Sequence, residues 1–119
     1  MNRVEVKNYK NKRIILIDFS NLKANEIMPV LEQAKQVIAK EPENSVLTLS
    51  DLTNMGFNPE VVGAIKDYMA HNKPYVKAGA VVGGKGLVDV VLNGLQRKTF
   101  RALTNFNTRE EALDWLVEA

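Results

Sequence analysis

Residues 46–69 read VLTLSDLTNMGFNPEVVGAIKDYM, and this stretch decides the fold. We predict a strand over residues 45–52 and a helix over residues 57–74. Asn58 can cap the start of that helix, and Pro59 suits its first helical position. A strand that leads through a loop into a helix is the unit from which α/β proteins with parallel sheets are built.

The segments on either side continue the alternation. Before the central strand we predict a charged, alternating strand and a nearly continuous apolar strand, joined by the turn NYKNK, and then a helix that begins around Asn25 and ends at Pro42. After it we predict a strand, a helix, a strand and a final helix, in which Thr108 and Glu111 have the spacing of a capping box. The other four predicted strands cover residues 3–9, 13–19, 75–82 and 100–106, and the last two helices cover residues 86–98 and 107–119.

This order predicts the fold class. The elements follow one another as β-β-α-β-α-β-α-β-α, which favours an α/β protein with helices on both faces of the sheet. The opening hairpin adds one antiparallel edge strand, so we expect a five-stranded mixed sheet with four helices. With 119 residues, the chain is predicted to be a single domain over residues 1–119.

Composition excludes several classes of function. A net charge of +2, without a basic run interleaved with aromatic residues, argues against nucleic-acid binding. Without cysteine and with one histidine, the chain has no disulfide, thiolate nucleophile or multi-histidine metal site. The charged first residues lack the apolar stretch of a signal peptide, and no apolar run is long enough to span a bilayer. We therefore expect a cytoplasmic protein with no transmembrane segment and no cofactor.

A glycine-rich turn follows the strand at residues 75–82. Gly79, Gly84 and Lys85 have the spacing of a nucleotide-binding P-loop, but Gly86 stands where that motif needs a hydroxyl. The residues between Gly79 and Gly84 include two valines, which extend a strand and leave too short a loop for a triphosphate. The turn can simply let the chain enter a helix, or its N–H groups can bind an anion.

If a ligand binds, we expect it at the carboxyl edge of the sheet, between the loop at residues 51–54 and the turn at residues 83–86. Unpaired N–H groups at helix N-termini favour an anion there, and the glycines leave room for a small anionic or apolar ligand to approach the backbone closely. The candidate ligand-binding residues are Asp51, Thr53, Gly83, Gly84, Lys85 and Gly86.

Two acidic residues offer an alternative chemistry. Asp18 and Asp51 each follow an apolar strand, so both carboxylates should reach the carboxyl edge of the sheet. They can form a paired acid site for proton transfer or a metal, or they can accept N–H bonds in their own loops, as Asp commonly does in turns. His71 is expected to be exposed at the end of its helix, where a cation is favourable.

The predicted helix at residues 86–98 is apolar on more than one side. A helix of this kind is buried, or it packs on something beyond its own sheet. We predict a homodimer that buries Val88, Val91 and Leu95, with a central helix or the wall of an apolar ligand site as alternatives. Trp115 and Leu116 of the last helix are expected in the core.

The stretch at residues 46–69 resembles the central strand, loop and helix of STAS domains, the bacterial anti-sigma-factor antagonists such as SpoIIAA. The runs NKPYVKAGAVVG and TREEALDWL extend the resemblance to the SpoIIAA-like group of small bacterial proteins, which is related to STAS and CRAL-TRIO lipid-binding domains. Regulatory STAS domains carry a phosphorylatable Ser at the start of the helix after the third strand. Residues 57–60 read FNPE here, and Thr53 is the nearest hydroxyl.

These observations together predict a non-enzymatic regulatory or ligand-binding module of the STAS/SpoIIAA-like type. It should lack the Ser switch, and it can have a regulatory protein partner. The alternative is a small hydrolase or transferase that uses Asp18 and Asp51.

Overall fold

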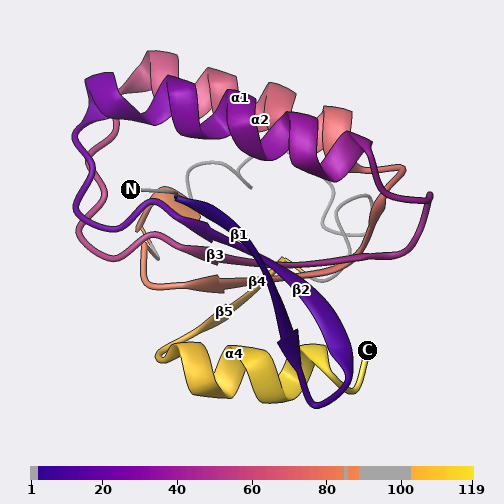
Figure 1. Ribbon diagram of the computed structural model, residues 1–119. Helices are drawn as coiled ribbons and strands as arrows, with labels where there is room; N and C mark the ends of the chain where they lie inside the picture. The colour runs from indigo at the N-terminus through magenta and orange to yellow at the C-terminus, as the bar shows by residue number, and fades with distance from the viewer. Residues whose placement is uncertain (1–2, 85, 89–102) are drawn as a thin grey trace.

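The computed structural model describes residues 3–84, 86–88 and 103–119 (Figure 1). A central sheet lies between two layers of helix, with α1 and α2 on one face and α4 on the other. The strands are β1 (Val4–Tyr9), β2 (Lys12–Asp18), β3 (Val46–Asp51), β4 (Val76–Val82) and β5 (Leu103–Phe106), and the helices are α1 (Ile27–Ala39), α2 (Pro59–Asn72) and α4 (Arg109–Leu116).

The sheet has the predicted mixed topology. Its strand order is β1-β2-β3-β4-β5, with β1 antiparallel to β2 and the other three pairs parallel. The five-stranded α/β architecture with an antiparallel edge strand is therefore confirmed. Residues 86–88 are helical, as expected for the start of the predicted helix at residues 86–98, and the rest of that segment lies outside the described residues.

A two-residue turn makes the opening hairpin. Tyr9 pairs with Lys12, and the two residues between them, Lys10 and Asn11, have φ angles of 49° and 67°. Positive φ at both central residues is typical of the tight turn whose twist matches that of two antiparallel strands. The turn predicted at NYKNK is confirmed.

Side-chain caps begin two of the helices where the sequence predicts them. The Asn58 side chain accepts a hydrogen bond of 2.8 Å from the Val61 N–H, and Thr108 accepts one of 3.2 Å from the Glu111 N–H. The first helix differs slightly from expectation. A 3₁₀ turn over Ala24–Glu26 precedes α1, so the regular helix begins just after the predicted start.

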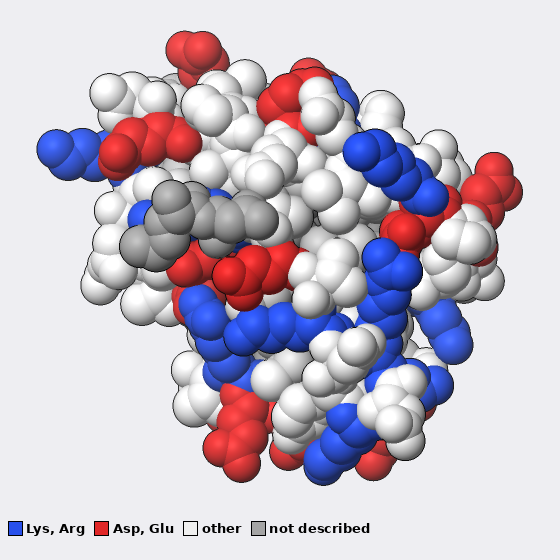
Figure 2. Space-filling view, in the orientation of Figure 1, with Lys and Arg blue, Asp and Glu red and all other residues white. Residues whose placement is uncertain are grey.

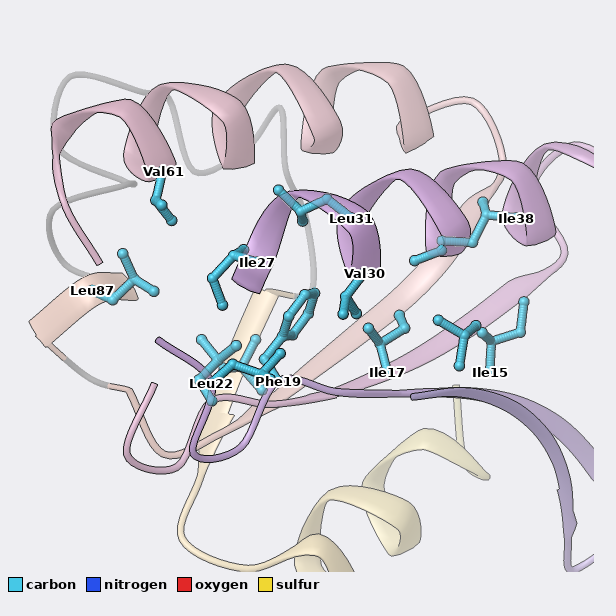
Figure 3. Close-up of a cluster of buried hydrophobic side chains, with 14 of the residues drawn as sticks. Ile15, Ile17, Phe19, Leu22, Ile27, Val30, Leu31, Ile38, Val61 and Leu87 are labelled. Atoms are coloured by element: carbon cyan, nitrogen blue, oxygen red, sulfur yellow. The ribbon is translucent and has the colours of Figure 1, made fainter. Parts of the chain in front are cut away.

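The sheet separates two apolar clusters, because successive side chains of a strand point to opposite faces. In β2, Ile15 and Ile17 pack toward α1 and α2 (Figure 3), whereas Ile14 and Leu16 pack toward α4. Both faces are covered, which explains the continuous apolar sequence of this strand. On the α4 side Leu116 is fully buried, as predicted.

An aromatic contact holds the last helix against the edge strand β5. The centroid of the Trp115 ring lies 5.5 Å from that of the Phe106 ring.

Over the parts of the chain that the structure describes, no helix combines the length and the apolar character needed to cross a bilayer.

Candidate functional site

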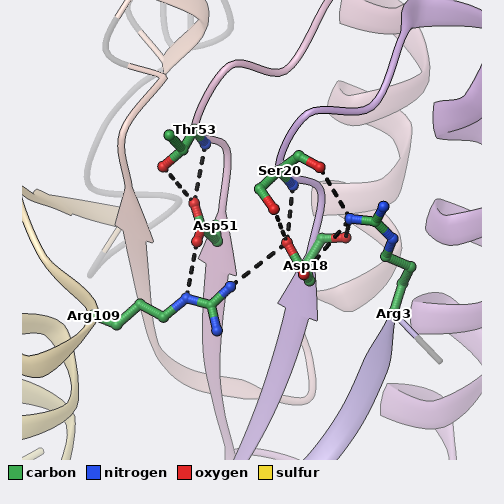
Figure 4. A network of polar contacts seen from close by, with 6 residues as sticks. All are labelled: Arg3, Asp18, Ser20, Asp51, Thr53 and Arg109. Atoms are coloured by element: carbon green, nitrogen blue, oxygen red, sulfur yellow. Dashed lines mark hydrogen bonds and ion pairs between the residues drawn. The ribbon is translucent and has the colours of Figure 1, made fainter. Parts of the chain in front are cut away.

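A network of polar side chains lies at the carboxyl edge of the sheet (Figure 4). It begins with Asp18 and Asp51, the last residues of β2 and β3, which are register partners in the parallel pair. Parallel strands end at the same edge, and the structure therefore brings these two sequence-predicted carboxylates together.

Each aspartate closes a tight loop with the hydroxyl residue two positions later. Asp18 Oδ1 accepts hydrogen bonds from the Ser20 N–H at 2.9 Å and the Ser20 hydroxyl at 2.5 Å. Asp51 Oδ1 accepts from the Thr53 N–H at 3.0 Å and the Thr53 hydroxyl at 2.6 Å. The same arrangement thus occurs twice, and it is the loop role that Asp commonly has.

Two arginines complete the network. Arg109, the first residue of α4, donates from Nε to Asp51 Oδ2 at 2.8 Å, and its Nη2 lies 3.6 Å from Asp18 Oδ1. On the other side, Nη1 of Arg3 lies 3.6 Å from Asp18 Oδ2 and donates to the Ser20 carbonyl at 2.9 Å. Every carboxylate oxygen in the network therefore has a partner within the chain.

The electrostatics of Asp51 follow from these contacts. Its carboxylate is buried, with 7% of the residue exposed, and burial alone would raise its pKa. Hydrogen bonds from Thr53 and Arg109 outweigh burial, so the pKa of Asp51 lies below its ordinary value. The group stays ionised at neutral pH, where it can be neither a proton donor nor a strong base.

The network is better suited to holding the fold together than to acid–base catalysis. Two carboxylates are balanced by two guanidinium groups, and the loop hydroxyls already occupy one oxygen of each acid. A carboxyl that acts as a general acid or base needs a pKa tuned toward the working pH, which for Asp requires an upward shift. In the described ranges, moreover, no three acidic or histidine residues lie together in a way that could hold a metal ion.

The glycine turn packs directly on the loop after β3. Gly83 and Gly84 have φ angles of 69° and 62°. A Cβ built on Gly84 would lie 2.6 Å from Leu52 Cβ, and one on Gly83 would lie 3.0 Å from Thr53 Oγ1. The space beside these glycines is therefore filled by Leu52 and Thr53 of the chain's own loop after β3.

Of the predicted ligand-binding residues, the structure brings four together: Asp51, Thr53, Gly83 and Gly84. Gly86 is exposed at the start of the helical residues 86–88, and Lys85 lies outside the described residues. His71 is exposed in the last turn of α2, as expected.

An apolar pocket of about 70 Å³ lies behind this contact, between the sheet and the pair of helices α1 and α2. Side chains that line it include Phe19 and Leu52 at the strand ends, Leu31 on α1 and Leu87 after the glycine turn. Ser50 and Tyr68 supply the only hydroxyl groups among its described lining residues. Burial raises the pKa of Tyr68, so its hydroxyl stays protonated.

Val88, predicted as an interface residue, also lines this pocket and is 8% exposed. Its side chain is thus part of the core of its own chain, whereas Val91 and Leu95 lie outside the described residues. The homodimer stays a prediction.

Sequence reasoning missed three members of the polar network. Ser20 has a detectable signal, because Asp18-Phe-Ser20 and Asp51-Leu-Thr53 repeat one pattern at two strand ends. Arg3 and Arg109 have none, because each reaches the network from a distant part of the sequence, 58 residues from Asp51 in the case of Arg109.

The comparisons with known proteins identify the fold. No protein-family model matches this chain, and no curated protein matches it in sequence. Among solved structures, it is similar to an uncharacterized protein with a SpoIIAA-like fold from Shewanella loihica. The two share a TM-score of 0.72 and 15% identity over 95% of this chain and 91% of that one.

It is also similar to an anti-sigma-factor antagonist (STAS) domain protein from Planctomyces limnophilus. Here the TM-score is 0.64 and the identity 15%, over 96% of this chain and 97% of that one. The SpoIIAA-like, STAS-type fold expected from the sequence is therefore confirmed.

Proposed function

We propose that the chain is a non-enzymatic binding module of the STAS/SpoIIAA-like type that takes a small, mostly apolar ligand in the pocket between the sheet and α1 and α2. The observation that carries the proposal is the pocket itself, an apolar hollow lined by side chains of the sheet, α1, α2 and the residues after the glycine turn. Protein interiors are close-packed, so an apolar hollow of this size is an exception.

The size and lining of the pocket define the class of ligand. Its volume of about 70 Å³ admits a short alkyl or small aromatic group rather than a whole drug-sized molecule. Ser50 and the protonated hydroxyl of Tyr68 can hydrogen-bond to one polar end of such a ligand. A ligand of several carbons with a single hydroxyl, amide or acid group fits this description.

The module is proposed to work without the Ser switch of regulatory STAS domains. Residues 57–60 contain no hydroxyl, and Asn58 is already committed to capping α2. A regulatory protein partner and a location in the bacterial cytoplasm are part of the proposal. Their support is the fold, which one neighbour shares as an anti-sigma-factor antagonist domain.

The test combines native mass spectrometry of protein taken directly from cells with NMR titration by benzene, a small apolar probe. We expect a retained small molecule in the first measurement. In the second we expect shifts confined to pocket methyl groups such as those of Leu52, Val81 and Leu87.

Two variants locate the site. Ser50→Phe places a ring in the pocket and should abolish the benzene shifts. Thr48→Val replaces a hydroxyl by a methyl group two residues earlier on β3, outside the pocket lining and without a change of size, and should leave them unchanged. Equal effects of the two variants, or no binding by the wild type, would refute the apolar site.

Inorganic phosphate is a second probe, and it tests the glycine turn. Shifts at Gly83 and Gly84 with phosphate alone would move the ligand site to the glycine turn.

A further inference from the structure

One polar atom in the core has no partner in the chain. Asn72, the last residue of α2, is 4% exposed, and its side-chain oxygen Oδ1 accepts no hydrogen bond. Among the described residues, it is the only buried side-chain nitrogen or oxygen atom without a partner. Buried polar side chains are nearly always hydrogen-bonded, so an unpaired one calls for an explanation, such as a bound molecule that supplies the missing partner.

The unpaired oxygen belongs to a pair of side chains beside the apolar pocket. Asn72 follows Tyr68 by four residues, so both side chains lie on one face of α2, and Tyr68 lines the pocket. Burial raises the pKa of Tyr68, and a hydrogen bond from the side chain of Asn72 opposes that rise. A bond with this effect is donated to the phenol oxygen. The hydroxyl proton of Tyr68 is not given to Asn72 Oδ1, which has no partner, and it remains available to another acceptor.

We propose that the polar end of the ligand binds to this pair, where it accepts a hydrogen bond from the Tyr68 hydroxyl and donates one to Asn72 Oδ1. The ligand is then a small neutral molecule whose polar group both donates and accepts, namely an alcohol, a phenol or a primary amide. The inference rests on the proposed function, because it concerns the same pocket. Ser50 of β3 offers a further hydroxyl on the sheet side of that pocket.

The surroundings disfavour an ionised ligand. None of the described residues that line the pocket carries a charge. An ion that enters such a site leaves water without gaining a counter-charge, which is costly. Figure 2 shows acidic and basic side chains next to one another on the visible face, so that this face attracts ions of neither sign from a distance.

The pair also sets the orientation of the ligand. The helix α2 begins after the loop at the carboxyl edge of the sheet and ends where the chain enters β4, so Tyr68 and Asn72 in its second half lie away from that edge. Toward the edge the pocket is lined by apolar side chains, among them Phe19, Leu52 and Leu87 (Figure 3). The alkyl or aromatic part of the ligand therefore lies toward the glycine turn.

NMR titration at neutral pH with three ring compounds measures this choice. Toluene and phenol have nearly the same size and differ by a methyl against a hydroxyl group, whereas benzoate carries a charge. A pocket without polar partners binds toluene more tightly than phenol, because the phenol hydroxyl loses its water and gains nothing. We expect instead that phenol binds roughly tenfold more tightly than toluene, the ratio that one or two net hydrogen bonds give. Benzoate should show no binding at the same concentrations.

Two variants test the pair, and a third is the control. Tyr68→Phe keeps the ring and Asn72→Leu keeps the approximate size of the side chain. Each should abolish the preference for phenol and leave the dissociation constant of toluene unchanged. Tyr9→Phe also removes a tyrosine hydroxyl, one that donates to Asp114 on the α4 side of the sheet, and it should leave both dissociation constants unchanged.

The outcomes separate this inference from the proposed function. Toluene that binds as tightly as phenol, or benzoate that does so, overturns the inference and leaves the apolar pocket of the proposed function in place. Binding of none of the compounds refutes both. A preference for phenol that survives Tyr68→Phe or Asn72→Leu, or that is lost in Tyr9→Phe, overturns the assignment to this pair. If a variant does not fold, the comparison of the three compounds on the wild type still decides.

Discussion

Asp18 and Asp51 are joined by the single guanidinium group of Arg109, which lies 2.8 Å from one carboxylate and 3.6 Å from the other. Because Asp18 ends β2 and Asp51 ends β3, the first residue of α4 spans two neighbouring strands. The start of the last helix is therefore tied to the middle of the sheet.

Arg109→Met should lower the free energy of unfolding by about 1–3 kcal/mol, because it leaves a buried, charged acceptor on Asp51 without its partner. Urea denaturation measures the change. Arg13→Met is the matched control, because the Arg13 side chain is 59% exposed where it pairs with the half-buried Glu41, and ion pairs that reach solvent contribute about 0–1 kcal/mol. Equal effects of the two variants would show that Arg109 does not hold the network together.

The contribution of Asp51 to stability should depend on pH. Its pKa is lower in the folded chain than in the unfolded chain, where it is about 3.9. The stabilisation is therefore complete above the unfolded pKa and is lost as the pH falls through the lower folded pKa. Unfolding free energies of wild type and Asp51→Asn should differ most near neutral pH, begin to converge below about pH 4, and meet only below the folded pKa of Asp51. A difference that stays constant from neutral to strongly acidic pH would contradict this assignment.

Gly84→Ala should destabilise the chain by about 2 kcal/mol or more, because the residue has a φ of 62° and its Cβ would lie 2.6 Å from Leu52 Cβ. Gly63→Ala provides the contrast. No atom lies within 4 Å of its added Cβ, and it stands inside α2, where Ala is favoured over Gly by roughly 0.5–1 kcal/mol. Thermal unfolding of both variants should show melting temperatures that shift in opposite directions.

A Ser/Thr kinase of the anti-sigma type should leave the protein unmodified. The start of α2 has no hydroxyl, and the nearest one, on Thr53, already donates to Asp51 at 2.6 Å. Intact-protein mass spectrometry after incubation measures the outcome, with a Ser-bearing STAS protein as the positive control. Stoichiometric phosphate on Thr53 would contradict this prediction. It would show that the loop opens to the kinase and that Thr53 takes the place of the phosphorylatable Ser.

Sequence patterns predicted the fold because its signals are local. The cap at Asn58, the turn after Tyr9 and the two-sided apolar run of β2 each depend on residues that are neighbours in the chain. Such patterns report which face of an element is buried and where the element ends. They also placed Asp18 and Asp51 at one edge of the sheet, because parallel strands share that edge.

The tertiary structure alone decided what those residues do. Arg109 contacts Asp51 across 58 residues of sequence, and no sequence pattern near either residue predicts the contact. The glycines at residues 83 and 84 could have opened a space for an anion, but packing placed the loop after β3 against them. The apolar pocket has no sequence motif either. It is a space left between side chains of the strand ends, of two helices and of the residues after the glycine turn, which come from distant parts of the sequence.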